Sequence, residues 1–364
     1  MQEIFDIYKR DIRQIQLKFL QDSFTDYDPN LCTLYQKYTT LDENYPRPLL
    51  TLFGIFCLKD DAPVLAECPD PEYLLISQLV RDVLAIHDDI IDEDIEKFGS
   101  PTLPVDYGRL FKHDVKGMVK EGKDLALLFG DYLYPKVYDI VLNTVLPAER
   151  KLAIISRINL IMRSTNIGQI EELMMQHRSV LCYSGLDILE MYRRKAADYC
   201  YAFPFELGAL YSGLSSDTIA LARETLLKLG ATSQVVDDLM GIFPEALGDA
   251  KDTLSDLLML RRSYILLKLA ERAKEHTKLA LILSKDNCNE TEALFLKEQI
   301  LSTGALMETV RSILEICIEI KKEITTLNIG KYCKQYFLKL VQSRVEENLY
   351  RIAGFFNLLG SNFS

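Results

Sequence analysis

The chain has 364 residues, of which 48% are hydrophobic and 26% are charged, and its formal net charge is −11. These values are typical of a globular chain with a sizeable core, and the acidic balance argues against a general nucleic-acid-binding protein, which would usually be basic. No apolar run is long enough to span a bilayer, and acidic residues throughout the N-terminal segment argue against a secretory signal.

Eight cysteines occur without a C-x-x-C pair or a regular spacing. This pattern is typical of reduced thiols that fill core space, and it argues against disulfides and zinc sites. We therefore expect a cytoplasmic protein.

Apolar residues recur at steps of three and four along most of the chain, which predicts helices. The pattern is strongest in five segments, which are residues 74–90, 149–175, 187–213, 215–240 and 291–324. Clusters of turn-forming residues separate the helical blocks at 45–48, 68–72, 98–104 and 243–249. No segment shows the short β-branched alternation of a strand. The sequence predicts one all-α domain over residues 1–364, built as a helical bundle.

The first of these helices ends in the acidic run HDDIIDED at residues 87–94. A helix turns about 100° per residue, so Asp88 and Asp92 share a face and Asp89 lies beside them. Carboxylate oxygens that converge in this way are ligands for Mg²⁺ or Mn²⁺. Because an unpaired carboxylate is costly to bury, this run is either a solvated helix end or has strong positive charge bound to it.

A second apolar helix carries the same feature in QVVDDLM, where Asp237 and Asp238 lie one turn after Gln234. Either acidic group alone is more typical of a solvated helix end. Two such pairs, each closing a strongly apolar helix, favour an acidic-walled cavity that Mg²⁺ and a diphosphate neutralise. A di-iron carboxylate site is excluded, because it needs Glu-x-x-His and no Glu stands three residues before any of the four histidines.

These motifs and their spacing resemble the trans-isoprenyl diphosphate synthase family. The resemblance covers about residues 40–270 and includes HDDIID, FGSPTLP, FGDYL, GQIEE, KAA and QVVDDLMGIF. It implies the isoprenoid-synthase fold, in which two aspartate-rich helix ends cap a central apolar cavity, usually in a homodimer. It also implies that Mg²⁺, with three ions expected and Mn²⁺ as an alternative, binds Asp88, Asp92 and Asp237 and grips an allylic prenyl diphosphate.

The resemblance assigns roles to further positions of this chain. It implies a catalytic group that consists of Asp88, Asp89, Asp92, Asp237, Asp238 and Lys195. It implies substrate-binding positions at Arg47, Arg81, Lys97, Gln169, Lys195, Gln234, Lys251 and Arg261. It places Val83 and Leu84, with Phe98, among the residues that shape the cavity and set product length.

The chain departs from the family pattern where isopentenyl diphosphate, the second substrate, binds. Asn44 stands where the family has a lysine, and Lys97 and Phe98 stand where it has two arginines. Lysine gives a point charge where arginine gives a bidentate fork, so this exchange matters at a diphosphate. An ungapped alignment offers Arg81 as a compensating cation. Elsewhere Ala196 replaces the usual threonine after the lysine, and Gly241 replaces the third acid of the second motif.

The predicted activity is condensation of an allylic prenyl diphosphate with isopentenyl diphosphate to an all-trans product of geranylgeranyl length or longer. The modest size of Val83 and Leu84 favours a product longer than farnesyl. A class I terpene cyclase on the same fold is the main alternative, because Phe98 weakens the second site. A noncatalytic subunit of a heteromeric synthase is less favoured, since both aspartate motifs are present. A helical scaffold without a small-molecule site is the least favoured alternative.

Overall fold

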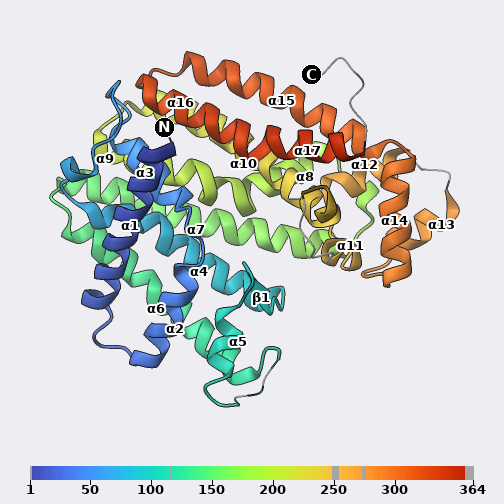
Figure 1. Ribbon diagram of the computed structural model, residues 1–364, viewed down its shortest axis with the longest axis horizontal. Coiled ribbons are helices and arrows are strands. Elements are labelled where there is room, and N and C mark those ends of the chain that lie inside the picture. The colour runs from blue at the N-terminus through green and yellow to red at the C-terminus, as the bar shows by residue number, and fades with distance from the viewer. Residues whose placement is uncertain (1, 113, 115, 248–253, 273–275, 357–364) are drawn as a thin grey trace. The chain divides into compact units, whose positions relative to one another are not determined.

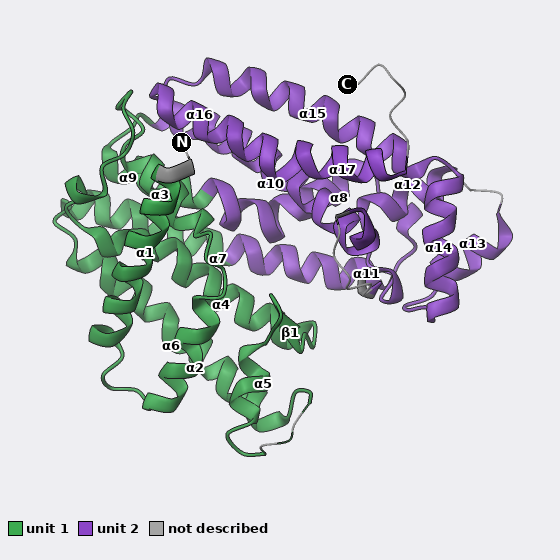
Figure 2. Cartoon of the chain, viewed as in Figure 1, with its two compact units in different colours: residues 1–162, 203–215 green, residues 163–202, 216–364 purple. Residues whose placement is uncertain are grey.

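The computed structural model describes residues 2–112, 114, 116–247, 254–272 and 276–356 (Figure 1). Helices make up nearly all of the regular structure in these residues, which confirms the all-α class. Contacts divide the chain into two compact units (Figure 2). Unit 1 holds residues 1–162 and 203–215, and unit 2 holds residues 163–202 and 216–364. A single domain over residues 1–364 stays a prediction.

Unit 1 is built from helices with one small hairpin. Its elements are α1 (Gln2–Ser23), α2 (Pro29–Thr39), α3 (Pro46–Ile55), η1 (Leu65–Glu67), η2 (Pro71–Leu74), α4 (Leu75–Ile91), β1 (Glu96–Lys97), β2 (Ser100–Pro101), α5 (Leu103–Gly108), α6 (Lys120–Asn143), the first part of α7 (Ala148–Gln176) and α9 (Phe203–Ser212). Helix α4 is buried over most of its length, so only its last turn brings carboxylates towards solvent.

The hairpin β1–β2 was not predicted from the sequence. The two strands are antiparallel, with Lys97 opposite Ser100, and the turn between them is formed by Phe98 and Gly99. Both turn residues have positive φ, 53° at Phe98 and 73° at Gly99, as a tight two-residue hairpin turn requires. Two-residue strands carry too little alternation to be recognised, and only the glycine marks the turn in the sequence.

Unit 2 holds the second aspartate pair. Its elements are the rest of α7, η3 (Val180–Cys182), α8 (Gly185–Tyr192), the π-helix η4 (Arg193–Ala202), α10 (Ser216–Ile242), η5 (Pro244–Leu247), α11 (Ser255–Leu258), α12 (Tyr264–Arg272), α13 (Thr277–Leu283), α14 (Glu290–Ser302), α15 (Ala305–Thr326), α16 (Lys331–Val341), the π-helix η6 (Gln342–Glu346) and α17 (Glu347–Phe355).

The wide π-helix η4 lies between α7 and α10 because both helices carry a glycine at the contact. A methyl group added to Gly168 of α7 would lie 2.5 Å from the backbone nitrogen of Lys195. One added to Gly230 of α10 would lie 2.5 Å from the Cα of Ala197. After η4, Pro204 lacks the N–H that would bond the carbonyl of Cys200 in an α-helix, which fits the irregular winding.

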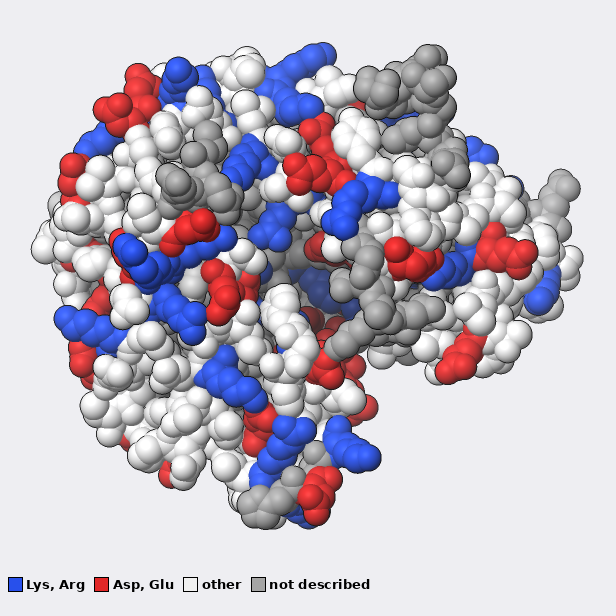
Figure 3. Space-filling model, viewed as in Figure 1, with Lys and Arg blue, Asp and Glu red and all other residues white. Residues whose placement is uncertain are grey.

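The surface of the molecule carries mixed charge. Figure 3 shows acidic and basic side chains interspersed over the face in view, without a broad area of positive charge. Such a face does not resemble the basic surface of a nucleic-acid-binding protein. Within the part of the chain that the structure describes, no helix is both long and apolar enough to cross a bilayer.

Candidate functional site

The aspartate-rich end of α4 presents two carboxylates to solvent on one side. Asp88 and Asp92 lie one helical turn apart, and both are partly exposed. The N–H of Asp92 donates to the carbonyl of Asp88 at 2.8 Å, so the helix continues to this residue before it ends. Accessible carboxylates at this spacing can bind one hard cation, as the sequence predicts.

Asp89, between them, is fully buried. Its Oδ1 accepts from Nζ of Lys97 at 2.5 Å, and its Oδ2 accepts from the hydroxyl of Tyr38 at 2.9 Å. Burial raises the pKa of Asp89, and the positive charge of Lys97 opposes that shift. Lys97, which was predicted to bind substrate, therefore has a carboxylate partner inside unit 1. Asp89 is buried, whereas its neighbours Asp88 and Asp92 are partly exposed.

Arg81 is also buried, with 6% of its surface exposed. Its Nη1 lies 3.0 Å from Oδ1 of Asp82, and its guanidinium lies over the ring of Tyr38, 5.7 Å from the ring centroid. The sequence offers Arg81 as a substrate-binding cation, and the structure places it in the same buried polar cluster as Tyr38 and Asp82.

The turn before α3 carries the residues that match the second-substrate motif. Arg47 lies in the first turn of α3 and is partly exposed. Asn44 is exposed, and its Oδ1 accepts from Nζ of Lys9 at 3.0 Å. Lys9 of α1 therefore brings a positive charge to the position where the family pattern has its own lysine.

The residues predicted to shape the cavity have contrasting environments. Val83 and Leu84 are buried in α4, with 2% and 7% of their surfaces exposed. Phe98 lies at the tip of the hairpin and is 63% exposed. The backbone of Phe98 has a φ of 53°, a conformation that non-glycine residues seldom adopt.

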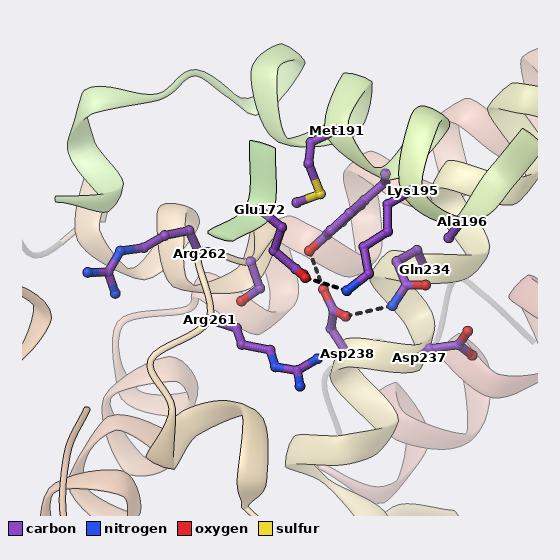
Figure 4. Close-up of a pocket in the computed structure, with 11 residues that line it drawn as sticks. Glu172, Met191, Lys195, Ala196, Gln234, Asp237, Asp238, Arg261 and Arg262 are labelled. Atoms are coloured by element: carbon purple, nitrogen blue, oxygen red, sulfur yellow. Dashed lines mark hydrogen bonds and ion pairs between the residues drawn. The ribbon is translucent and has the colours of Figure 1, made fainter. Parts of the chain in front are cut away.

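In unit 2, a pocket of about 130 Å³ gathers most of the residues predicted there. It is lined by Glu172, Met191, Tyr192, Lys195, Ala196, Gln234, Asp237, Asp238, Arg261, Arg262 and Ser263. Nζ of Lys195 forms an ion pair with Glu172 of α7 (Figure 4). Both side chains are 17% exposed, so the pair is largely shielded from solvent. Glu172 is the last residue of the GQIEE motif, and no role was predicted for it from the sequence.

Asp238 is held by hydrogen bonds from two sides. It accepts from the hydroxyl of Tyr192, and from Nε2 of Gln234 at 3.1 Å (Figure 4). Asp237 points away from these partners in Figure 4 and is exposed. Although solvent reaches it, the surrounding protein raises the pKa of Asp237 to about 6, an effect that the charge of Arg344 partly offsets. Asp237 is thus the accessible carboxylate of the pair.

The two arginines of the pocket differ. Arg261 points towards Asp238 in Figure 4 and adds a second positive side chain to the pocket. Arg262 points away from it, and its guanidinium donates to backbone carbonyls that include those of Gln176 at 2.8 Å and Arg178 at 2.7 Å. Its role is therefore structural.

Two further predicted positions lie elsewhere. Gln169 is on α7, and its Nε2 is buried without a hydrogen-bond partner among the described residues. Lys251 lies outside the described residues. The structure thus groups Asp88, Asp89 and Lys97 in unit 1, and Lys195, Asp238 and Arg261, with their neighbours, in unit 2.

The partners that sequence reasoning missed are Glu172, Tyr38, Tyr192 and Lys9. Tyr38 lies on a different helix from Asp89, 51 positions earlier in the chain, and Glu172 precedes Lys195 by 23 positions. No local spacing rule connects residues this far apart. The one available signal was the charge of Asp89, which demanded a donor without identifying it.

Comparison with known proteins adds a family match. The family model described as polyprenyl synthetase matches residues 44–300. A geranylgeranyl diphosphate synthase of Sulfolobus acidocaldarius is 26% identical over 228 residues, which are 61% of this chain and 62% of that protein. A geranylfarnesyl diphosphate synthase of Natronomonas pharaonis is 26% identical over 232 residues, 61% of this chain and 63% of that protein. The chain therefore spans about three fifths of the length of these relatives.

Solved structures match nearly the whole chain. A geranylgeranyl pyrophosphate synthase from Corynebacterium glutamicum, determined with isoprenyl diphosphate and magnesium, has a TM-score of 0.80 at 19% identity and covers 94% of this chain and 99% of its own. A decaprenyl diphosphate synthase from Rhodobacter capsulatus has a TM-score of 0.73 at 16% identity, with 94% and 96% covered. At these identities the likeness shows a shared fold.

Proposed function

We propose a function for this chain on the basis that it belongs to the polyprenyl synthetase family. It is a Mg²⁺-dependent trans-prenyltransferase. It joins an allylic prenyl diphosphate to isopentenyl diphosphate and forms a longer all-trans prenyl diphosphate, of geranylgeranyl length or beyond. The observation that carries this proposal is the pocket of unit 2, where Lys195 and Arg261 lie with the carboxylates of Asp237 and Asp238. Cations and metal-binding carboxylates in one pocket suit a metal-bound diphosphate.

The donor set fits Mg²⁺. Asp88, Asp92 and Asp237 supply accessible carboxylate oxygens, which are the hard ligands this ion prefers. Bound Mg²⁺ would supply Lewis-acid stabilisation of the diphosphate as it leaves the allylic carbon. We propose three ions, with Mn²⁺ as an alternative.

The side chains of the unit 2 pocket have roles of their own in this reaction. The ammonium of Lys195 and the guanidinium of Arg261 bind the departing diphosphate and stabilise its growing negative charge. Asp238, fixed by Tyr192 and Gln234, keeps its end of α10 in position for Asp237. Lys195 must exchange Glu172 for the diphosphate when substrate binds, so Glu172 competes with the substrate for this cation.

Product length depends on the apolar residues below the carboxylates. The positive charge that develops on the allylic carbon has to be shielded from water until the double bond of isopentenyl diphosphate attacks it. A proton is then lost, and the chain has grown by five carbons. The buried Val83 and Leu84, one turn before Asp88, are modest in size, which supports a product longer than farnesyl diphosphate.

A pair of parallel incubations tests the function. Purified protein with Mg²⁺ receives an allylic diphosphate with or without isopentenyl diphosphate. We expect longer prenyl diphosphates only when isopentenyl diphosphate is present. Hydrocarbon products without it would instead identify a terpene cyclase, the alternative that the exposed Phe98 favours. Failure of any turnover would point to the noncatalytic subunit.

We expect Phe98→Arg to lower the KM for isopentenyl diphosphate by about 10-fold, because a guanidinium would add a charge-assisted contact to the diphosphate. Phe98→Gly is the matched control, since it relieves the positive-φ strain of the turn without adding charge. Steady-state kinetics with a saturating allylic substrate measure both. An equal gain in the two variants would mean that strain, and not the missing cation, limits this site.

We further propose that the chain acts as a homodimer through α7, in the cytoplasm. Apolar side chains on α7 form an exposed stripe that includes Ile167, Ile170, Leu173 and Met174. Ile170 and Met174 are 59% and 60% exposed and lie one turn apart. A helix that exposes apolar residues at such spacing is suited to packing against another helix.

Ile170→Asp should convert the dimer to a monomer, because a buried unpaired carboxylate is costly at an apolar interface. We expect a dissociation constant raised by at least about 100-fold, equivalent to about 2.8 kcal/mol. Leu221→Asp is the control, since Leu221 is 61% exposed on a different helix, α10. Sedimentation velocity over a concentration series gives the result, and a dimeric Ile170→Asp protein would place the interface elsewhere.

A further inference from the structure

We propose that Tyr38 of α2 is a positioning residue for metal binding, which acts through Asp89 at the aspartate-rich end of α4. This inference rests on the proposed function. The hydroxyl of Tyr38 donates to Oδ2 of Asp89 at 2.9 Å, and both residues are buried, with 4% and 0% of their surfaces exposed. A hydrogen bond to a buried carboxylate is among the stronger contacts in a protein, and the carboxylate is destabilised when a donor is removed.

Asp89 is held on both of its oxygens by different elements of unit 1. Tyr38 comes from α2, and Lys97, which donates to Oδ1 at 2.5 Å, comes from strand β1. Lys97 also supplies the positive charge that a buried carboxylate needs. Asp89 is therefore committed to contacts inside the protein, which leaves Asp88 and Asp92, its partly exposed neighbours, to bind metal.

The way Asp89 is held determines where those neighbours point. The backbone carbonyls of Asp88 and Asp89 accept from the N–H groups of Asp92 and Asp94, at 2.8 and 3.0 Å, so the last turn of α4 and the residues after it form one hydrogen-bonded unit. If Asp89 loses a donor, its side chain has to find another partner and this turn shifts. A shift of a fraction of an ångström is enough to weaken a site built for near-octahedral Mg²⁺.

The chain provides a matched control in a second tyrosine–aspartate pair on the same two helices. Tyr35 of α2 is fully buried, and its hydroxyl donates at 2.8 Å to Oδ2 of Asp82, two turns before Asp89 on α4. Asp82 also accepts from Thr39 and from Nε2 of Gln78. Tyr35→Phe and Tyr38→Phe therefore each remove a hydroxyl that donates to a buried carboxylate of α4. Of these two tyrosines, only Tyr38 contacts the metal-binding motif.

The experiment compares wild type, Tyr35→Phe and Tyr38→Phe by thermal unfolding. Mg²⁺ is titrated at a fixed concentration of inorganic pyrophosphate, and the Mg²⁺ concentration that gives half of the maximal stabilisation is recorded. We expect both variants to unfold a few degrees below wild type without Mg²⁺. We expect Tyr38→Phe to need about 10-fold more Mg²⁺, and Tyr35→Phe to stay within about 2-fold of wild type.

Equal Mg²⁺ requirements in the two variants would overturn the proposal, because the hydroxyl of Tyr38 would then contribute to stability alone. If Tyr38→Phe does not fold, Lys97→Met removes the other donor to Asp89, and its positive charge, from the part-exposed hairpin and must raise the Mg²⁺ requirement in its place. A wild-type protein that Mg²⁺ and pyrophosphate do not stabilise would contradict the proposed function itself, and this inference with it. The wild-type titration thus separates the two failures.

Discussion

The Asp88→Ala variant should release pyrophosphate from an allylic prenyl diphosphate at least about 100-fold more slowly than wild type in the presence of Mg²⁺. Asp88 is one of two accessible carboxylates on the last turn of α4, and its loss leaves Asp92 to bind metal alone from this helix. Because Asp88 is only partly buried, we expect the variant to fold with little change in thermal stability.

Single-turnover assays with geranylgeranyl diphosphate or a shorter allylic substrate measure this effect. Glu93→Ala is the control, since Glu93 is an exposed carboxylate in the same acidic run and forms an ion pair with Lys123, at 2.6 Å. Its pyrophosphate release should stay within about 2-fold of wild type, as expected for an exposed ion pair of small energetic value. Wild-type rates in both variants would remove Asp88 from the metal site.

The Gly168→Ala variant should lose about 3 kcal/mol of folding free energy, along with most of its affinity for pyrophosphate. The added methyl group would lie 2.5 Å from the backbone nitrogen of Lys195 and 2.8 Å from its Cα. Backbone atoms cannot turn aside as a flexible side chain can, so η4 has to move away from α7. Lys195 would move with it, out of its present contact with Glu172.

Chemical denaturation and calorimetric titration with Mg²⁺ and pyrophosphate measure these two effects. Gly354→Ala is the control, because nothing lies within 4 Å of a methyl group added at this position of α17. Alanine has the higher helix propensity, so this variant should be neutral or more stable by up to about 1 kcal/mol. If the free energy of unfolding of Gly168→Ala were equal to that of Gly354→Ala, the prediction would be wrong, because η4 would then accommodate the added methyl group.

The fold class could be predicted from the sequence because helical periodicity is a local property. The apolar steps of residues 74–90 predicted α4 almost to its last residue, and the position of Asp88 and Asp92 on its final turn followed from helix geometry. The hairpin at Phe98 could not be predicted in this way, since its two-residue strands are set by their pairing.

The candidate site could be predicted only in part. The sequence identified which carboxylates and cations to consider, but it treated Asp89 and Lys97 as separate contributors, whereas they form an ion pair with each other. It likewise predicted that Lys195 binds the substrate, but it did not identify Glu172 as the partner of Lys195. Pairings of this kind arise when distant helices pack, and residue spacing within one helix carries no information about them.

The π-helical winding of residues 193–202 has a consequence for the direction of Lys195. A π-turn holds more residues than an α-turn, so deletion of a single residue between Lys195 and Pro204 would allow ordinary α-helical winding to resume. Lys195, on the N-terminal side of the deletion, would then be rotated by about 100° about the helix axis. The chain would keep its helices and nearly its whole composition, yet the ammonium group would be aimed at a different neighbour.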